Sequence, residues 1–127
     1  MFLFQIKFYA HRILQKTKGN TPVLEFIEST PVKHRKKIFY KINRLKEYGL
    51  QQSLQTNIVK KIRGEKYKGL YELTIDWDKL FYRIFFTIIE RTCWVLCGIK
   101  KKSNKTPTNE LDKAINLKKQ IEKQILK

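Results

Sequence analysis

The sequence predicts an α+β fold: a small, twisted and mostly antiparallel sheet with helices on one face, in the order β-α-α-β-β-β-β-α. Two observations support this prediction. Between residues 57 and 99, apolar side chains recur with the two-residue period of strands, and the connections between the segments are short. Each of the three prolines follows a threonine, a pairing that favours the start of a helix. At 127 residues, the chain is expected to form a single domain with one core.

The first predicted strand covers Phe2–Tyr9, in which two rows of side chains alternate along the chain. The Thr-Pro pairs then predict three helices, over Pro22–Glu28, Pro31–Tyr48 and Pro107–Leu126. In each case we expect the threonine hydroxyl to cap the first turn. Gly49 is a natural end for the second helix.

Four further strands are expected between the second and third helices. They are Asn57–Arg63, Leu70–Ile75, Leu80–Ile89 and Cys93–Lys100, with a turn over residues 76–79. The segment Leu80–Ile89 is almost continuously apolar, which is typical of a strand covered on both faces. We therefore expect it to lie in the middle of the sheet, one face of which is partly open.

The balance of charge indicates a polyanionic partner. The chain has 28 Lys and Arg against 11 Asp and Glu, for a net charge of +17. A domain this basic is expected to meet nucleic acid, an acidic membrane or an acidic protein. No segment approaches the ~20 apolar residues of a membrane span, and the amino-terminal apolar run is too short for a signal peptide. We therefore expect a cytoplasmic protein.

The two cysteines predict neither a disulfide nor a metal site. On a regular strand Cys93 and Cys97 would face the same side, roughly 13 Å apart at ~3.3 Å per residue, which is too far for a disulfide. The two histidines, His11 and His34, are distant in sequence and complete no ligand set. Buried thiols, no metal and no cofactor are the expectation.

Arg83 is the sharpest candidate for a functional residue. It lies within the most apolar strand, with Phe81 and Phe85 on its own face. A guanidinium in such a place needs an anion, because an unpaired buried charge is very costly. An ion pair with Glu72 and a clamp on a phosphate are both consistent with the pattern, and one does not exclude the other.

Further cations end two of the predicted strands. They are Lys60, Lys61 and Arg63 on one strand, and Lys100, Lys101, Lys102 and Lys105 on another. Each group alone could be a solvated edge, but together with Arg83 they could form a groove for a nucleic-acid backbone. The sequence has no Gly-rich phosphate loop and no Ser-His-Asp pattern. If the domain cleaves RNA, lysine, arginine, tyrosine and glutamate must do so.

Four short motifs occur in these strands and after them: Lys61-Ile62-Arg63-Gly64, Leu70-Tyr71-Glu72-Leu73, Tyr82-Arg83-Ile84 and the run from Gly98 to Pro107. In this order they resemble the RelE/ParE toxin superfamily, and most of all its HigB-like, phage-derived branch. The resemblance extends from about Thr21 to the carboxyl terminus. It has departures: Thr74 stands where the motif usually has arginine, while Ile99 and Ser103 replace phenylalanine and threonine.

The resemblance implies a RelE-like fold and the toxin of a type II toxin–antitoxin system. Such a toxin is a metal-independent, ribosome-dependent endoribonuclease, an mRNA interferase that cuts mRNA in the ribosomal A site and inhibits translation. A cognate helix-turn-helix antitoxin of the HigA type would neutralise it in a hetero-oligomer. The residues that match the family's motifs are Arg83, Glu72, Lys101, Lys102 and Lys105. Together with the basic strands described above, they give the expected catalytic residues, Arg83, Lys61, Lys101 and Glu72, and the expected RNA-binding residues, Lys60, Arg63, Lys100, Lys102 and Lys105.

Two alternatives remain open at this stage. A toxin of the same fold could act on DNA gyrase, as the ParE branch is thought to do, although the lysine-rich tail motif favours the nuclease. A basic RNA-binding or phage module without catalysis is the other alternative, which the departure at Thr74 supports.

Overall fold

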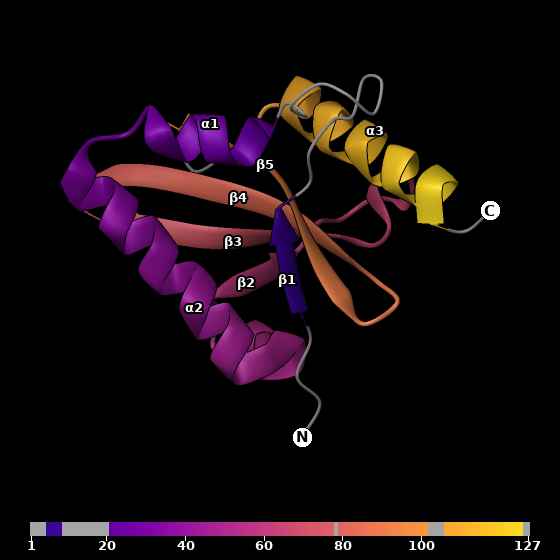
Figure 1. Ribbon diagram of the computed structural model, residues 1–127, viewed down its shortest axis with the longest axis horizontal. Coiled ribbons are helices and arrows are strands. Elements are labelled where there is room, and N and C mark those ends of the chain that lie inside the picture. The colour runs from indigo at the N-terminus through magenta and orange to yellow at the C-terminus, as the bar shows by residue number, and fades with distance from the viewer. Residues whose placement is uncertain (1–4, 9–20, 78, 102–105, 126–127) are drawn as a thin grey trace, which may run out of the picture.

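The computed structural model describes residues 5–8, 21–77, 79–101 and 106–125 of the chain (Figure 1). Its elements are β1 (Gln5–Phe8), α1 (Pro22–Glu28), α2 (Val32–Gln55), β2 (Val59–Lys61), β3 (Leu70–Trp77), β4 (Leu80–Ile89), β5 (Thr92–Lys101) and α3 (Thr108–Ile125). A short 3-10 helix, Glu65–Tyr67, lies between β2 and β3. The predicted order of helices and strands is confirmed.

The sheet has five strands in the order β1-β5-β4-β3-β2. The three pairs formed by β2, β3, β4 and β5 are antiparallel, while β1 runs parallel to β5 at the edge. The strand β4 therefore lies in the middle of the sheet, as its apolar sequence predicts. The α+β class and the mostly antiparallel sheet are confirmed.

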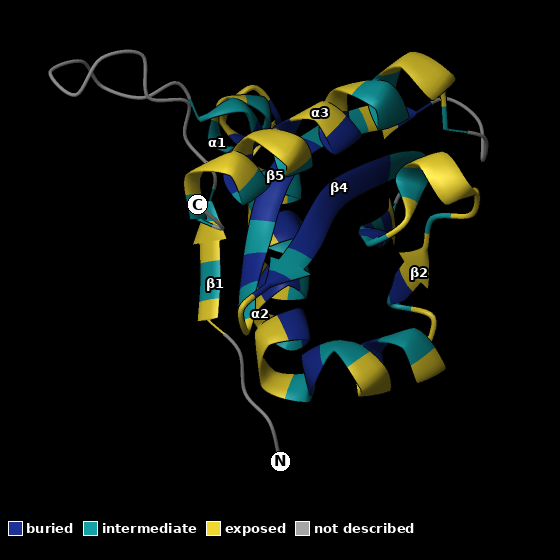
Figure 2. Cartoon of the chain, turned by 90° about the vertical axis from the view of Figure 1, so that its right-hand side faces the viewer, coloured by how far each residue is buried: buried dark blue, intermediate teal, exposed yellow. Residues whose placement is uncertain are grey.

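The helices lie on both faces of the sheet, so the prediction of helices on one face is wrong for α3. On one face, which we call the α2 face, Ile84 and Phe86 belong to a core that also contains Ile38 of α2. On the other, the α3 face, Phe85 packs in a second core with Leu117 of α3. Figure 2 shows β4 and β5 between these helices. Because β4 is apolar on both sides, burying it requires cover on both faces.

The α3 face has an apolar part and a polar part. Its apolar core contains Phe85 from the middle of β4 together with Leu70 and Ile89, which lie where β3 begins and β4 ends. At the other end the same face carries Thr74, which lies opposite Arg83 in the ladder. Arg83, Glu72 and Lys101 are all buried at this polar end of the α3 face, so the partly open face that the sequence predicts is not confirmed here.

A β-bulge shifts the register between β4 and β5. Phe85 pairs with Cys97 but Phe86 pairs with Val95, so Leu96 is an extra residue on β5. Cys93 consequently lies in the core of the α2 face and Cys97 in that of the α3 face. The prediction that the two cysteines face the same side is wrong, since it assumed a regular strand. Burial raises the pKa of both thiols, that of Cys97 to about 12.

Gly98, which follows the bulge, allows α1 to approach the sheet closely. A Cβ atom at this position would lie 2.7 Å from a side-chain carbon of Ile84 and 2.7 Å from one of Phe26. Both distances are shorter than van der Waals contact, so any larger residue would push α1 away from β5.

Gly49 interrupts α2. Its φ of 79° and ψ of 174° are not helical, so the first helical segment ends there, as the sequence predicts, and a second segment follows as far as Gln55. The packing of Leu50 and Leu54 against the core of the α2 face stabilises this second segment.

The predicted threonine caps are absent from α1 and α2. Thr21 makes no side-chain cap bond, and the hydroxyl of Thr30 donates to the carbonyl of Ile27.

The helix α3 is tied to the segment between β2 and β3. The Lys66 ammonium lies 2.8 Å from Asp112, and the Tyr67 hydroxyl donates to the same carboxylate oxygen at 2.7 Å. These two contacts hold the pKa of the Asp112 carboxyl below its usual range. Within the described ranges, no helix has the length and apolar character needed to cross a membrane.

Candidate functional site

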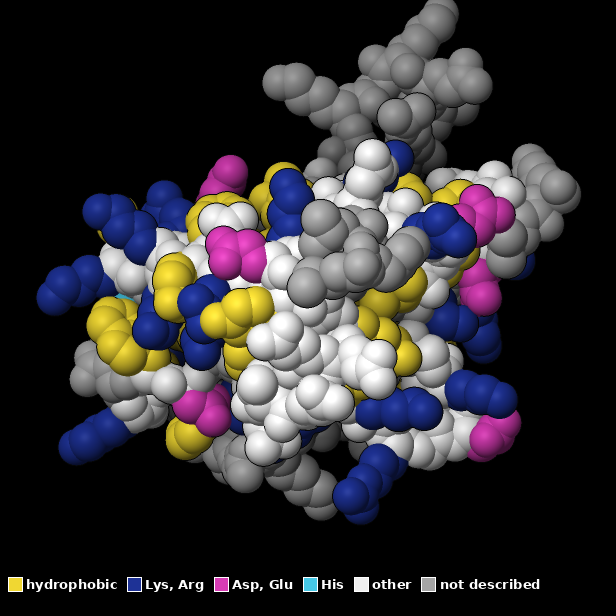
Figure 3. Space-filling model, turned by 90° about the horizontal axis from the view of Figure 1, so that it is seen from below, with side chains coloured by type: hydrophobic (Ala, Val, Ile, Leu, Met, Phe, Trp, Pro, Cys, Tyr) yellow, Lys and Arg dark blue, Asp and Glu magenta, His cyan; other side chains and the backbone are white. Residues whose placement is uncertain are grey.

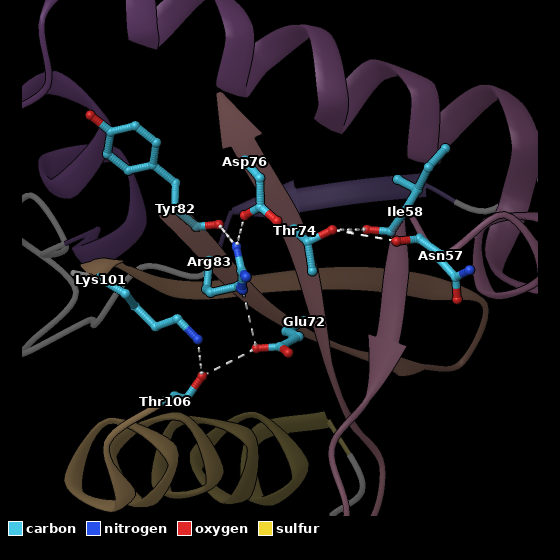
Figure 4. Close-up of polar contacts among 9 residues, drawn as sticks. All are labelled: Asn57, Ile58, Glu72, Thr74, Asp76, Tyr82, Arg83, Lys101 and Thr106. Carbon is cyan, nitrogen blue, oxygen red and sulfur yellow. Dashed lines mark hydrogen bonds and ion pairs between the residues drawn. The ribbon is translucent and has the colours of Figure 1, made fainter. Parts of the chain in front are cut away.

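Arg83 lies at the centre of the polar end of the α3 face. It extends from the middle strand β4 and only 1% of its surface is exposed. Its guanidinium donates to the Asp76 carboxylate at 2.5 Å and to the Tyr82 carbonyl at 2.9 Å, and its Nε lies 4.0 Å from the Glu72 carboxylate (Figure 4). The predicted ion pair between Arg83 and Glu72 is thus present at its outer limit, while Asp76 forms the shorter contact.

The two carboxylates flank Arg83 because they lie on the same strand and the same face. Glu72 lies two positions before Thr74 and Asp76 two positions after it, and Thr74 lies opposite Arg83. Their exposure differs: the side chain of Glu72 is 12% exposed and that of Asp76 is 53% exposed. Asp76 can therefore turn toward solvent at much lower cost than Glu72.

Lys101 brings a second cation to this site from the end of β5. It is 5% exposed, and its ammonium donates to the Thr106 hydroxyl at 3.0 Å. Burial, and then the neighbouring charge of Arg83, lower the pKa of Lys101 below its ordinary value, although Glu72 and Asp76 oppose the shift. A lysine with a lowered pKa gives up its proton more readily near neutral pH.

Thr106 links the second cation to a carboxylate. Its hydroxyl accepts from Lys101 and donates to Glu72 at 3.5 Å, so the three side chains form a chain of contacts (Figure 4). Neither Thr106 nor Asp76 is predicted as a site residue from the sequence: Thr106 is expected to start a helix within the basic motif, and Asp76 to lie in a turn. The sequence does contain one indication for Thr106, because its hydroxyl comes directly after the lysine-rich end of a strand.

The structure brings together only part of the predicted set. Arg83, Glu72 and Lys101 meet, and Lys60 lies on the same side of the sheet, opposite Glu72 in the ladder. Lys61 lies opposite Tyr71, whose side chain packs on the α2 face, so the alternation of the strand turns Lys61 away from Arg83.

The remaining predicted cations lie elsewhere. Lys100 pairs with Tyr82 and so belongs to the α2 face, where it is exposed. Arg63 follows the end of β2 and lines a groove together with Lys61 along that edge of the sheet. Lys102 and Lys105 are outside the described residues.

Thr74 occupies the position at which the resemblance would place an arginine. It lies directly opposite Arg83, and its hydroxyl donates to the carbonyls of Ile58 and Asn57 at 3.2 and 3.4 Å. The threonine thus ties β3 to the connection between α2 and β2 in place of adding a cation to the site.

The potential metal ligands are dispersed in the structure. Within the described part of the chain, no three His, Cys, Asp or Glu side chains gather where they could hold a metal ion. His34 lies on the α2 face, where its Nδ1 is 2.6 Å from the Tyr82 hydroxyl in a hydrogen bond. It therefore has a packing role, remote from the side chain of Arg83.

The site can in principle bind a phosphate and move a proton. A guanidinium and an ammonium lie beside two carboxylates on an otherwise apolar sheet, and one carboxylate is exposed enough to make room for another anion. Charged groups aimed at a partly buried site interact with a developing charge more strongly than they do in water. No reaction beyond acid–base and electrostatic chemistry needs to be assumed for these residues.

Comparison with known protein families gives one match. The model of the family described as Phage derived protein Gp49-like (DUF891) matches residues 25–119, which cover α2, the strands β2 to β5 and most of α3. No curated protein matches the chain. The chain therefore belongs to the phage-derived Gp49-like family, which is related to the RelE-type toxins of toxin–antitoxin systems.

Proposed function

We propose that this protein is the toxin of a type II toxin–antitoxin pair, of the HigB-like branch, and that it acts as a ribosome-dependent endoribonuclease. Its activity would be metal-independent cleavage of mRNA in the ribosomal A site, in the cytoplasm. Membership of a phage-derived family related to RelE-type toxins supports the toxin role. The net charge of +17 supports an RNA target.

One observation carries the catalytic part of the proposal: Arg83 and Lys101 meet beside Glu72 at the polar end of the α3 face. Two cations held close together in a partly buried site repel each other, and the nearby carboxylates offset this cost. Such an arrangement is suited to an added phosphate, which would take the place of the Asp76 carboxylate on the guanidinium. Asp76, which is half exposed, would turn outward as RNA enters.

The proposed reaction is an attack of a ribose 2′-oxygen on the adjacent phosphorus. Glu72 takes the proton of the 2′-hydroxyl while the new bond forms between O2′ and phosphorus. The bond between phosphorus and O5′ breaks, and the Lys101 ammonium donates a proton to the leaving O5′. The products are a 2′,3′-cyclic phosphate and a free 5′-hydroxyl, and Arg83 neutralises the additional negative charge on the pentacoordinate phosphorus.

Thr106 would restore the starting state. After cleavage Glu72 holds a proton and Lys101 lacks one, and the Thr106 hydroxyl contacts both side chains. A proton passed from Glu72 to Thr106 and from Thr106 to Lys101 returns each group to its initial form. Lys60, which is exposed on the same side of the sheet, would bind a flanking phosphate. Lys61 is left out of the catalytic set because it faces the other way.

The test adds the purified chain to translating ribosomes and maps mRNA ends by primer extension. We expect cuts within codons, and we expect Arg83→Ala and Lys101→Ala to remove them. Lys100→Ala is the matched control, since it removes the neighbouring lysine from the opposite face and should leave cleavage intact. Equal cleavage by wild type and Arg83→Ala would disprove the catalytic assignment.

The same preparations separate the proposal from its alternatives. Inhibition of DNA supercoiling by gyrase, without mRNA cleavage, would favour the ParE-like function. Salt-sensitive RNA binding without cleavage would favour a non-catalytic RNA-binding module. A helix-turn-helix protein that binds the chain and suppresses cleavage would identify the expected antitoxin.

A further inference from the structure

The solvent side of α2 carries aromatic rings that its core does not use. We define the outer face of α2 by Lys33, Lys36, Lys37, Phe39, Tyr40, Arg44 and Tyr48. The helix buries a different stripe, which includes Ile38, Ile42 and Leu45. Tyr40 is 50% exposed and Phe39 is 38% exposed, two of the large apolar side chains that the structure leaves in solvent. Exposed apolar side chains that lie together on a surface rimmed by polar residues can mark an interaction site.

Cations and rings alternate along this face. The Lys37 ammonium lies 5.4 Å from the centre of the Tyr40 ring. The Arg44 guanidinium lies 5.7 Å from the same ring and 4.2 Å from the ring of Tyr48. These distances are within cation–π range, so the cations hold the rings in place on the surface. Figure 3 shows the resulting mixture of blue and yellow side chains on the side of the molecule to which α2 belongs.

The charge of α2 also indicates an anionic partner. Its basic residues are Lys33, Arg35, Lys36, Lys37, Lys41, Arg44 and Lys46, and its one acidic residue is Glu47. The first turn contains no acidic residue, and four of the cations lie near the amino-terminal end of the helix. The helix dipole is positive there, so this placement destabilises the isolated helix. A bound polyanion would remove that cost.

We propose that the outer face of α2 is an additional binding surface for single-stranded RNA, separate from the site around Arg83. The lysines would contact phosphates along the strand, and the rings of Tyr40 and Phe39 would stack on unpaired bases. Alternating cations and exposed rings are the combination by which proteins bind single strands without reading their sequence. The proposal does not depend on catalysis, because α2 packs on one face of the sheet and Arg83 projects from the other.

Two other partners fit this face less well. The bases of a duplex are already stacked on each other, so a duplex would leave the rings of Phe39 and Tyr40 without a partner. An acidic protein segment could pair with the lysines but offers no stack of flat bases. The exposed rings therefore favour a single strand.

The test measures binding of a fluorescent oligouridylate of about twelve nucleotides by anisotropy, without ribosomes; about four to sixteen nucleotides occupy such a site. We expect Tyr40→Leu to weaken binding at least about fivefold, which is the low end for loss of one stacked base. Tyr40→Phe keeps the ring and should bind as wild type does. Circular dichroism of each variant checks that the fold is intact, as expected for a substitution at a half-exposed position.

The electrostatic contribution is tested with a matched pair of double variants. Lys36→Gln with Lys37→Gln should weaken binding and reduce the slope of log affinity against log salt by about 0.7 for each phosphate that is no longer neutralised. Lys119→Gln with Lys123→Gln removes the same charge from exposed positions on α3 and should change the slope less. An oligonucleotide containing 5-iodouridine, irradiated in the complex, should cross-link to Tyr40 or Phe39.

Two results would overturn the proposal. One is unchanged affinity in Tyr40→Leu together with cross-links that map outside α2. The other is competition by polyglutamate as effective as that by the RNA, which would assign the face to an acidic protein. Both measurements use free RNA, so they remain interpretable whether or not mRNA is cleaved on the ribosome.

Discussion

On one face of β4, Tyr82, Ile84 and Phe86 are buried under α1 and α2, where the neighbouring side chains are almost all apolar. On the other, Arg83 is as deeply buried as these residues, yet it is surrounded by charged and hydroxyl groups. Neighbouring residues of a single strand thus lie in opposite environments. The alternation of side chains along a strand lets one element stabilise the fold and carry charged groups at once.

The two faces of β4 contribute differently to the free energy of folding. Apolar burial on the α2 face is favourable in itself, by roughly 25 cal/mol for each Å² removed from water. A buried ion pair on the α3 face is at best a small gain, because desolvation offsets the attraction of the charges. Substitutions on the two faces should therefore differ in which property they change, stability or activity.

The largest effect should come from the α2 face. Phe86→Ala removes a ring that is 1% exposed, and we expect it to lower the free energy of unfolding by about 3–5 kcal/mol. Urea denaturation followed by circular dichroism measures the change. Phe39→Ala, at an exposed position of α2, is the control and should cost within about 0.5 kcal/mol. A loss below about 1 kcal/mol at Phe86 would show that this core is not tightly packed.

Next in size is the loss of activity on the α3 face. Arg83→Met should reduce mRNA cleavage on ribosomes at least about 100-fold, the typical cost of removing a group that stabilises charge in the transition state. Its melting temperature should stay the same or rise, because an apolar side chain of similar length replaces a buried ion pair. Arg83→Lys keeps the charge but not the planar fork, and we expect most of the activity to be lost. A variant that unfolds would instead show that Arg83 is structural.

The free energy of unfolding should depend on pH through Lys101 but not through Lys100. The folded-state pKa of Lys101 lies below its ordinary value, so between that pKa and about 10.5 the unfolded chain binds more protons than the native one. The contribution of Lys101 to the free energy of unfolding therefore rises with pH across that window. Lys101→Met should remove the rise in a urea titration series, while Lys100→Met should keep it. In the proposed mechanism, cleavage by wild type falls over the same window as Lys101 loses its proton.

The smallest effect concerns Thr106. Thr106→Val keeps the shape of the side chain but removes the hydroxyl between Lys101 and Glu72, and it should cost about 0.5–1.5 kcal/mol of stability. Turnover after the first cut should slow several-fold, since the proposed return path of the proton is lost. Thr106→Ser restores a hydroxyl and should recover the rate. Multiple-turnover and single-turnover kinetics distinguish the two steps, and an equal change in both would exclude a role in the reset.

Local patterns in the sequence were sufficient for much of the fold. The bounds of Pro22–Glu28 and Leu80–Ile89 are the same in prediction and structure, because each has a clear period and a clear boundary signal. The neighbouring positions of Glu72 and Arg83 also followed from antiparallel pairing across a short turn. These inferences need only residues that are close in sequence.

What the sequence could not supply depends on contacts between distant segments. The period of the apolar residues in α3 predicts a helix with one apolar side. It does not predict which face of the sheet that side packs against. The caps predicted at the Thr-Pro pairs are absent from α1 and α2, because a hydroxyl near a helix start also has other partners within reach, such as the Ile27 carbonyl for Thr30. Asp76 became a partner of Arg83 because β3 extends to Trp77, two residues beyond the predicted end of that strand.

The bulge in β5 has a consequence for the α3 face. Leu96 has no partner on β4, and regular pairing continues after the bulge. Ile99 therefore lies beside Arg83, and Lys101 lies beside Phe81. A chain that lacked Leu96 would present the same side chains to the α3 face from a regular strand. Leu96 is itself fully buried in the core of the α3 face, so the extra residue also adds apolar packing on the face that carries the charged site.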